Sequence, residues 1–304
     1  MTHGPLSRAL ADGPVILDGG LATLLEARGH DLGSALWSAR LLIDDPGAIV
    51  AAHAAYFEAG AQVATAASYQ ASHDGFAALG LDRTEANRML RRSVKLARTA
   101  RDEAQRGGWV AASVGPYGAV LADGSEYRGD YGLTVTELRD FHRPRLAVLA
   151  DAEPDVLALE TLPCLAEVEA VLAETAQLGI PAWLSVTVAN GRLRSGESVA
   201  EAFALAADAP HVLAVGVNCS APGEVLGVVE QAVAVRPGVA YPNSGQQWDA
   251  TARAWVGASA FDPALVRGWV DAGARLVGGC CRVGPAEIRA IADALHAGEA
   301  GFDI

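Results

Sequence analysis

Three cysteines stand at the ends of two apolar runs, where together they could hold one metal ion. Cys280 and Cys281 follow Gly278-Gly279 at the end of the last apolar run, and Cys219 ends an earlier run. Adjacent residues of a regular strand point to opposite faces, so Cys280 and Cys281 can share an ion only where the backbone leaves the strand, which the two glycines make easier. Zinc prefers thiolates, and three protein ligands with an open fourth position are typical of catalytic zinc. The pattern therefore predicts Zn²⁺ held by Cys219, Cys280 and Cys281.

Other roles for these cysteines are open at the level of the sequence. Buried cysteine often packs as a small hydrophobic side chain, and adjacent cysteines can form a strained, redox-active disulfide. The fourth cysteine, Cys164, follows Pro163 just beyond another apolar run. We expect Cys164 to be structural, because a fourth thiolate would close the metal to a substrate.

The composition argues against several classes of protein. With 23 Lys and Arg against 36 Asp and Glu, the net charge of -13 argues against a nucleic-acid or anionic-membrane partner. No apolar run reaches the roughly 18 residues that span a bilayer, and no signal-peptide pattern is found. Four cysteines in 304 residues are too few for a disulfide scaffold. We expect a cytoplasmic monomer whose partners are small molecules.

Short apolar, β-branched runs alternate with helical stretches along the chain. Candidate strands cover residues 15–20, 63–69, 109–116, 156–161, 182–188, 212–219, 239–243 and 275–281. Helical periodicity covers residues 46–59, 84–106, 136–150, 166–178, 224–235, 263–272 and 285–296. This repeated alternation predicts an α/β fold, a single (β/α)8 TIM barrel domain over residues 1–304, with a doubly wound open sheet as the alternative.

Residues that could do chemistry gather at the ends of these runs. In a (β/α)8 barrel, the carboxyl ends of the strands and the loops after them form the active site. The first run ends in Asp18-Gly19-Gly20, the fourth in Glu160-Thr161 and the sixth in Asn218-Cys219. A carboxylate that ends an apolar strand is costly to bury without a cationic partner, which favours a functional role for Glu160. Asp18 is by itself equally consistent with a turn before two glycines.

Three motifs resemble those of the zinc-dependent homocysteine S-methyltransferase family, and they occur in the family's order: Asp18-Gly19-Gly20, Gly216-Val217-Asn218-Cys219 and Gly278-Gly279-Cys280-Cys281. Residues 67–71, 113–119, 122–131 and 241–245 are most similar to the branch that uses S-methylmethionine or S-adenosylmethionine. The resemblance implies methyl transfer from such a sulfonium donor to the thiolate of L-homocysteine, giving methionine. Betaine or another methyl donor with the same zinc-thiolate chemistry, and a non-catalytic zinc-binding or redox-sensing barrel, are the alternatives.

The resemblance also implies roles for individual residues around homocysteine. Asp18 and Glu160 would hold its ammonium group. Backbone amides near Gly19 and Gly20 would hold its carboxylate, and Asn218 would position the amino acid or orient the adjacent metal ligand. Coordination to zinc deprotonates a thiol whose pKa is otherwise about 8.5. A sulfonium then needs no general acid, because it leaves as a neutral thioether.

A site for the methyl donor would combine aromatic and polar side chains. A sulfonium gains a cation–π interaction on an aromatic face, and the aromatic candidates are Tyr69, Tyr117, Tyr127 and Trp37. The polar candidates are Ser68, Gln70, Glu126 and Asn243.

Overall fold

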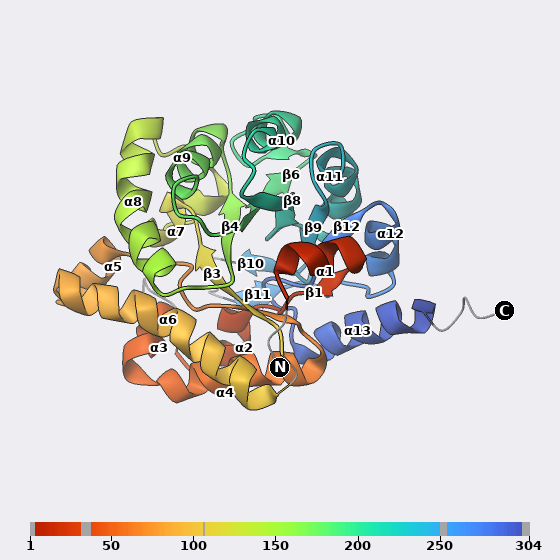
Figure 1. Cartoon of the computed structure of the whole chain (residues 1–304), viewed down its shortest axis with the longest axis horizontal. Coiled ribbons are helices and arrows are strands. Elements are labelled where there is room, and N and C mark those ends of the chain that lie inside the picture. Colours follow the sequence, from red (N-terminus) through yellow and green to blue (C-terminus); the bar gives the residue numbers. More distant parts are fainter. Residues whose placement is uncertain (1–3, 32–37, 106, 250–253, 300–304) are drawn as a thin grey trace.

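The structure, a computed structural model, describes residues 4–31, 38–105, 107–249 and 254–299. It confirms the predicted barrel, in which a ring of parallel strands is surrounded by helices (Figure 1). The barrel strands are β1 (Val15–Ile16), β2 (Val63–Thr65), β3 (Trp109–Val114), β4 (Val156–Leu162), β5 (Ala182–Val186), β8 (Val212–Asn218), β9 (Gly238–Tyr241) and β12 (Ala274–Val277).

The order of the strands closes on itself. Neighbouring strands run β1-β12-β9-β8-β5-β4-β3-β2 in one sheet, and every pair is parallel. A parallel bridge between Leu17 and Val63 joins the two ends of this order. The amide of Asp18 also donates to the carbonyl of Val63 at 3.1 Å. These contacts between the first and second strands exclude the open-sheet alternative.

Helices fill the connections between the strands. They are α2 (Leu21–Ala27), α3 (Ser38–Asp44) and α4 (Pro46–Ala59) after β1; α5 (His73–Ala78) and α6 (Arg83–Ala104) after β2; α7 (Tyr117–Leu121), η1 (Ser125–Tyr127) and α8 (Val135–Asp151) after β3; α9 (Leu165–Thr175) after β4; α10 (Val199–Ala207) after β5; η2 (Pro222–Glu224) and α11 (Val225–Ala232) after β8; α12 (Leu265–Asp271) after β9; and α13 (Pro285–Glu299) after β12. Side chains define the start of helix α6 through a capping box. The Asp82 carboxylate accepts from the amide of Glu85, and the Glu85 carboxylate accepts from the amide of Asp82.

Among the described residues, no helix combines the length and the apolar character needed to cross a membrane.

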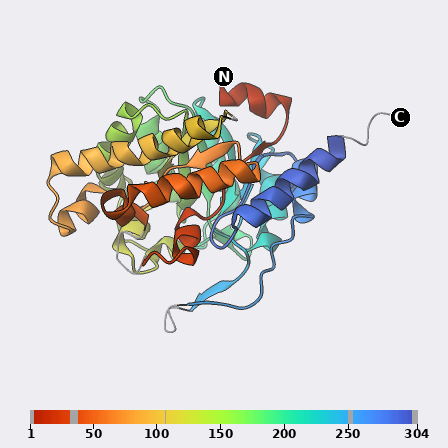
Figure 2. The ribbon, with the colours of Figure 1, turned by 90° about the horizontal axis from the view of Figure 1, so that it is seen from below.

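Several elements were not predicted from the sequence, among them the short helices α2, α3, α5 and α7 at the carboxyl side of the strands. Helix α10 occupies the connection after β5, and α1 (Leu6–Asp12) precedes the barrel. The buried residues of α10, Val199, Ala202, Phe203 and Ala206, recur with helical spacing, so this helix was within reach of the sequence. Two hairpins interrupt connections on the carboxyl side of the strands: β6 (Val188–Ala189) with β7 (Arg192–Leu193), and β10 (Gln247–Asp249) with β11 (Ala254–Val256). The β10–β11 hairpin projects from the body of the barrel on the side opposite α1 (Figure 2). Strands of two or three residues are too short for alternation to reveal them.

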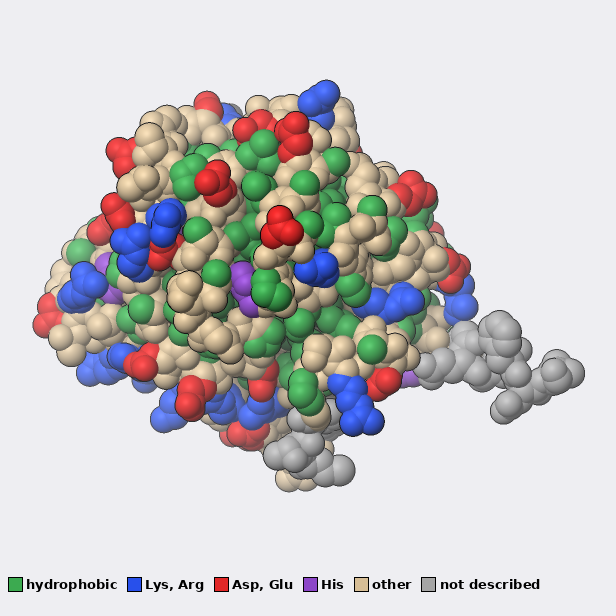
Figure 3. All heavy atoms as spheres, turned by 45° about the horizontal axis from the view of Figure 1, so that its top comes forward, with side chains coloured by type: hydrophobic (Ala, Val, Ile, Leu, Met, Phe, Trp, Pro, Cys, Tyr) green, Lys and Arg blue, Asp and Glu red, His purple; other side chains and the backbone are tan. Residues whose placement is uncertain are grey.

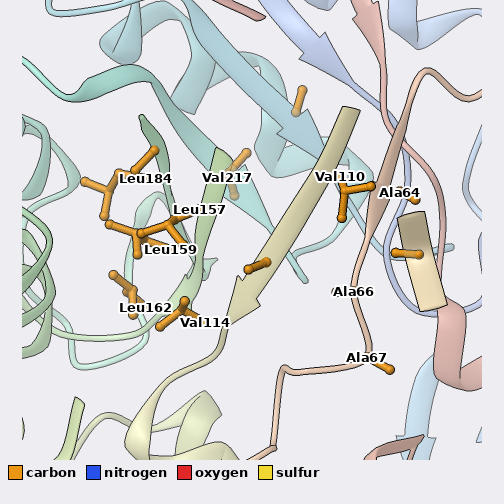
Figure 4. Close-up of a cluster of buried hydrophobic side chains, with 14 of the residues drawn as sticks. Ala64, Ala66, Ala67, Val110, Val114, Leu157, Leu159, Leu162, Leu184 and Val217 are labelled. Carbon is orange, nitrogen blue, oxygen red and sulfur yellow. The ribbon is translucent and has the colours of Figure 1, made fainter. Parts of the chain in front are cut away.

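Alternation along the strands separates an outer core from the barrel interior. Val110, Ala112 and Val114 of β3 belong to the layer between strands and helices, together with residues such as Leu157 and Leu159 of β4 (Figure 4). The intervening residues point into the barrel, because successive side chains of a strand face opposite sides. Burying both faces explains why the strands are almost continuously apolar.

The barrel interior is apolar at one end and polar at the other. Leu6 and Leu10 of α1 pack with Trp109 and other inward residues, and the Trp109 indole donates to the carbonyl of Gly4 at 3.0 Å. Towards the carboxyl ends of the strands, the inward positions become polar. These positions are Thr65, Ser113, Glu160, Ser185 and Asn218. The amino end is therefore plugged, and the carboxyl end carries hydrogen-bonding groups.

The outer surface shows no concentration of one charge on the face drawn in Figure 3. Acidic and basic side chains are interspersed there, with hydrophobic side chains between them (Figure 3). The surface ion pairs include Arg91 with Asp151 at 2.7 Å and Arg143 with Glu174 at 2.9 Å. Exposed pairs of this kind contribute at most about 1 kcal/mol each.

Candidate active site

A cavity opens at the carboxyl ends of the barrel strands. Its empty volume is about 790 Å³ including the open mouth. The side chains that can carry charge or bind metal within it are Asp18, Glu126, Glu160, Cys219, Cys280 and Cys281. No Lys, Arg or His is among the described residues that line it. The cavity is therefore a site for cations, for a metal ion, or for both.

The three predicted metal ligands meet in this cavity. Their Sγ atoms lie within 4.8 Å of one another, and the Cys219 and Cys280 sulfurs are 2.7 Å apart. Cys164 is buried at the start of α9 and is not in the cluster. Burial raises the pKa of the Cys164 thiol to about 12, which keeps it protonated and unreactive.

The backbone leaves the strands where the cysteines occur. Strand β12 ends at Val277, so Cys280 and Cys281 lie in the following loop, as predicted. Gly278 and Gly279 do not adopt the left-handed conformation, which is found instead at Arg282 (φ 65°) and Cys219 (φ 48°). The two glycines are needed because their surroundings leave no room for a side chain. A Cβ on Gly279 would collide with the side chain of Val283.

Two neighbouring loops hold the cysteine loop in place. The amide of Cys280 donates to the carbonyl of Pro242 at 2.8 Å, and the amide of Cys281 donates to Asn243 Oδ1 at 3.0 Å. On the other side, a Cβ on Gly19 would collide with the carbonyl of Val283. The Asp18-Gly19-Gly20 segment thus packs directly against the cysteine loop, which requires glycine.

Hydrogen bonds within the thiol cluster make the three sulfurs unequal. Bonds from Cys280 and Cys281 hold the pKa of Cys219 well below its ordinary value. The same bonds raise the pKa of Cys280 and, through Cys219, that of Cys281. Cys219 is therefore the first of the three to become a thiolate, and its negative charge already favours a cation in the cluster.

Asp18 lines the cavity next to the cysteine loop, where its carbonyl accepts from the amide of Gly279 at 3.1 Å, and it is only 3% exposed. Its two carboxylate oxygens accept from Thr65, one from the amide at 2.7 Å and one from the hydroxyl at 2.8 Å. Burial outweighs these bonds and raises the Asp18 pKa to about 7. A cation beside this carboxylate would lower the pKa again and be bound in return.

Glu160 is held by a chain of hydrogen bonds that crosses the barrel. Its Oε2 accepts from the Tyr241 hydroxyl at 3.0 Å, and that hydroxyl accepts from the Trp183 indole at 3.0 Å. Its Oε1 accepts from the Ser113 hydroxyl. Glu160 is 6% exposed, and burial raises its pKa to about 8. The carboxyl group is thus fixed in orientation and lacks a positive partner within the cavity lining.

Asn218 joins the barrel wall to the thiol cluster. Its Oδ1 accepts from the Thr161 amide at 2.8 Å and from the Ser185 hydroxyl at 2.9 Å. Its Nδ2 donates to Thr161 Oγ1 at 2.7 Å and points to the Cys280 sulfur at 4.0 Å. These bonds hold Thr161 at φ 63°, an unusual conformation for a β-branched residue. The strand register between β4 and β5 shifts at the same place.

The candidates for the methyl donor divide into two groups. Tyr69, Gln70, Glu126 and Tyr127 line the cavity. Ser68, Tyr117 and Asn243 lie outside its lining: Ser68 donates to the Ser113 carbonyl, Tyr117 packs on Tyr131 and Phe141, and Asn243 holds the Cys281 amide. Trp37 lies outside the described residues.

Glu126 is the least satisfied carboxylate of the site. It is 7% exposed, and its buried Oε2 has no hydrogen-bond partner among the described residues. Burial raises its pKa to about 7. A buried acceptor of this kind favours a donor or a cation from a ligand.

Sequence reasoning did not identify Thr65, Ser113, Thr161 and Tyr241 as parts of the site. Three of them lie on inward positions of the barrel strands, in register with the last apolar inward residues. This alternation could have identified them from the sequence, because a polar residue at an inward position near the carboxyl end of a barrel strand lies at the active face.

Comparison with known proteins matches nearly the whole chain to one family. Residues 15–295 match the family model described as homocysteine S-methyltransferase. Homocysteine S-methyltransferase 4 of Zea mays is 47% identical over 96% of this chain and 92% of its own length. Homocysteine S-methyltransferase of Escherichia coli is 46% identical over 95% of this chain and 98% of its own length.

Solved structures agree with the sequence comparison. The metallated form of the homocysteine methyltransferase MmuM from Escherichia coli superposes with a TM-score of 0.83 at 43% identity, covering 93% of this chain and 98% of that one. Its oxidized form gives a TM-score of 0.85 at 42% identity, covering 96% and 99%.

Proposed function

Because the chain belongs to the homocysteine S-methyltransferase family, we propose that its cavity binds zinc and L-homocysteine and transfers to the homocysteine sulfur a methyl group from a sulfonium donor. The product is methionine. The observation that carries the proposal is the composition of the cavity, in which three thiols share the lining with buried carboxyl groups and the described lining residues include no Lys, Arg or His.

The thiol cluster fits a zinc ion with three protein ligands. Three cysteine sulfurs from two loops converge, and the described residues contribute no fourth His, Cys, Asp or Glu to the group. Thiolates on one tetrahedral zinc ion lie roughly 3.8 Å apart for Zn–S bonds of about 2.3 Å. The distance between the Cys219 and Cys280 sulfurs would therefore increase by about 1 Å when zinc binds. When bound, zinc would accept the homocysteine sulfur as fourth ligand and keep it deprotonated at neutral pH.

The two carboxylates on the cavity walls suit the ammonium group of homocysteine. Asp18 and Glu160 keep acceptor capacity beyond the bonds from Thr65, Ser113 and Tyr241, because each ionised carboxylate oxygen accepts more than one bond. An ammonium group between them would lower both raised pKa values and remain charged itself. Gly19 and Gly20 line the same wall, where their backbone would face the carboxylate of homocysteine.

The donor would enter on the side of Tyr69, Gln70, Glu126 and Tyr127. Aromatic faces stabilise a sulfonium cation, and the neutral thioether that leaves loses this stabilisation. Asn218 has its oxygen committed to Thr161 and Ser185, so we assign it the orientation of Cys280.

The test is methionine formation by purified protein given homocysteine with S-methylmethionine, S-adenosylmethionine or betaine in parallel. Each assay is run before and after removal of zinc by a chelator, and after zinc is restored. Turnover with a sulfonium that disappears with zinc and returns with it supports the proposal. Equal turnover in zinc-free protein would refute the role of the metal, and turnover with betaine alone would refute the donor class.

A further inference from the structure

Arg194 is a cation beside the cavity that none of the roles above uses. It follows β7, in the connection after β5, and its amide donates to the Thr187 carbonyl at 3.2 Å. Its guanidinium carbon lies 5.4 Å from the centre of the Tyr127 ring, which lines the cavity. Its Nε is buried without a hydrogen-bond partner, and no carboxylate pairs with it within the described residues.

Nearby arginines are satisfied differently. Arg128, next to Tyr127 in sequence, lies 3.3 Å from Asp130 and 3.8 Å from Asp123. Arg192, on the same hairpin as Arg194, is exposed and donates to the Gly196 carbonyl at 3.0 Å. A partly buried guanidinium without an anion is costly, so Arg194 has an unmet preference for a carboxylate.

Glu126 supplies the opposite charge at the same wall. It precedes Tyr127 in η1, lines the cavity, and carries the buried and unpartnered Oε2 described above. Glu126 and Arg194 thus bring one unmatched anion and one unmatched cation to the neighbourhood of one aromatic ring. This arrangement is complementary to the zwitterionic end of an α-amino acid.

We propose that Arg194 and Glu126 form the subsite for the amino-acid end of the methyl donor, with Arg194 binding the α-carboxylate and Glu126 the α-ammonium group. The proposal rests on the proposed function. In a sulfonium derived from methionine, five bonds separate the transferable methyl carbon from the carboxylate carbon, a span of roughly 6 Å. The Tyr127 ring lies between the two ends of such a donor, since it lines the cavity together with Cys219 and Arg194 lies over its face. The donor class is therefore sulfonium compounds that keep a free α-amino-acid group.

The experiment compares two donors, S-methylmethionine and its α-carboxamide, in wild type and Arg194→Ala. In wild type, the carboxamide should show a KM about 10- to 100-fold higher, as expected for loss of a charge-assisted contact. Arg194→Ala should raise the KM of S-methylmethionine by a similar factor and leave the carboxamide unchanged, so that the two losses are not additive. The KM of homocysteine and the zinc content should stay at wild-type values.

Matched variants separate binding from folding. Arg192→Ala removes the same charge from the same hairpin and should leave both donors at wild-type KM. Arg194→Gln keeps a planar group on Tyr127 and provides the test if the alanine variant does not fold. Glu126→Gln should raise the KM of S-methylmethionine as well.

Two results would overturn the assignment. An equal loss of both donors in the Arg194 variants would show that this residue only braces Tyr127, and unchanged KM values would show that the donor does not contact it. Wild-type protein that forms no methionine from S-methylmethionine, from its carboxamide or from S-adenosylmethionine would overturn the proposed function itself, and the subsite with it.

Discussion

Substituting Asn218 by alanine tests how the barrel wall sets the thiol cluster. The change removes the acceptor for the Thr161 amide and for the Ser185 hydroxyl, and the amide that points to the Cys280 sulfur. All three partners stay in place around a small cavity. If the side chain orients the metal ligand, stability and zinc retention should fall together, while homocysteine binding to zinc-loaded protein changes little.

The magnitude follows from the lost bonds. Each buried donor left without an acceptor costs about 1–3 kcal/mol. Two such donors, the Thr161 amide and the Ser185 hydroxyl, lose about 2–6 kcal/mol together. Relaxation of Thr161 from φ 63° returns roughly 1 kcal/mol, so the net loss is about 1–5 kcal/mol. About 2–4 °C in Tm accompanies each kcal/mol in a large domain, which gives a fall of roughly 2–20 °C. Loss of an outer partner of a metal ligand weakens metal binding about 10- to 100-fold.

Calorimetry of the metal-free protein measures the first effect, and zinc competition against a chelator measures the second. Ser185→Ala is the matched control, because it removes one of the bonds to Asn218 and leaves Thr161 and Cys280 untouched. We expect it to lower Tm by roughly 3 °C without changing zinc affinity. The reasoning is refuted if Asn218→Ala keeps the wild-type Tm and zinc affinity. A rise in the KM of homocysteine alone would instead identify Asn218 as a substrate contact.

Three further predictions concern the same site. Cys280→Ser should lose zinc and turnover together, by metal analysis and methionine assay, whereas Cys164→Ser, outside the cluster, should keep both; a fully active zinc-free Cys280→Ser protein would contradict the ligand assignment. Burial raises the pKa of Glu160 from 4.5 to about 8 in the folded protein. The neutral carboxyl group therefore stabilises the metal-free, ligand-free fold fully below pH 4.5, and this stabilisation is lost as the pH rises through 8. Urea unfolding should show this decline, with a flatter profile for Glu160→Gln; a rise in stability across that range would contradict it. Gly279→Ala, whose new methyl group has no room beside the following loop, should lower Tm and zinc retention, while Gly268→Ala in α12 has open space and should leave both intact or slightly raise Tm.

Much of the fold was predictable because its signals are local. Strand β3, for example, is an apolar run whose alternate residues meet the helices and the barrel interior, and both faces are buried. The weak points were short elements, which are too brief to show a period. Helix α7 has five residues, and the β6–β7 hairpin has two residues in each strand. Their conformations are fixed by contacts with the barrel.

The site shows the same division between local and long-range information. Local patterns were enough to predict that three thiols, two carboxylates and an asparagine lie at the strand ends of one barrel, because parallel strands bring their carboxyl ends to one face. They could not determine what each side chain contacts. The bond from Tyr241 to Glu160 joins residues 81 positions apart, and the approach of Cys219 to Cys280 joins residues 61 apart.

Which carboxylates already accept hydrogen bonds from the protein follows from tertiary packing. Both oxygens of Asp18 accept from Thr65, whereas the buried Oε2 of Glu126 has no hydrogen-bond donor among the described residues. In the sequence, Arg194 is one of many arginines, and its position on Tyr127 follows from the packing of two connections, after β3 and after β5, that are distant in the chain. Residue type fixes which charges the chain can offer; the closure of the barrel fixes which of them are left for a ligand, because burial and pairing depend on neighbours distant in the chain.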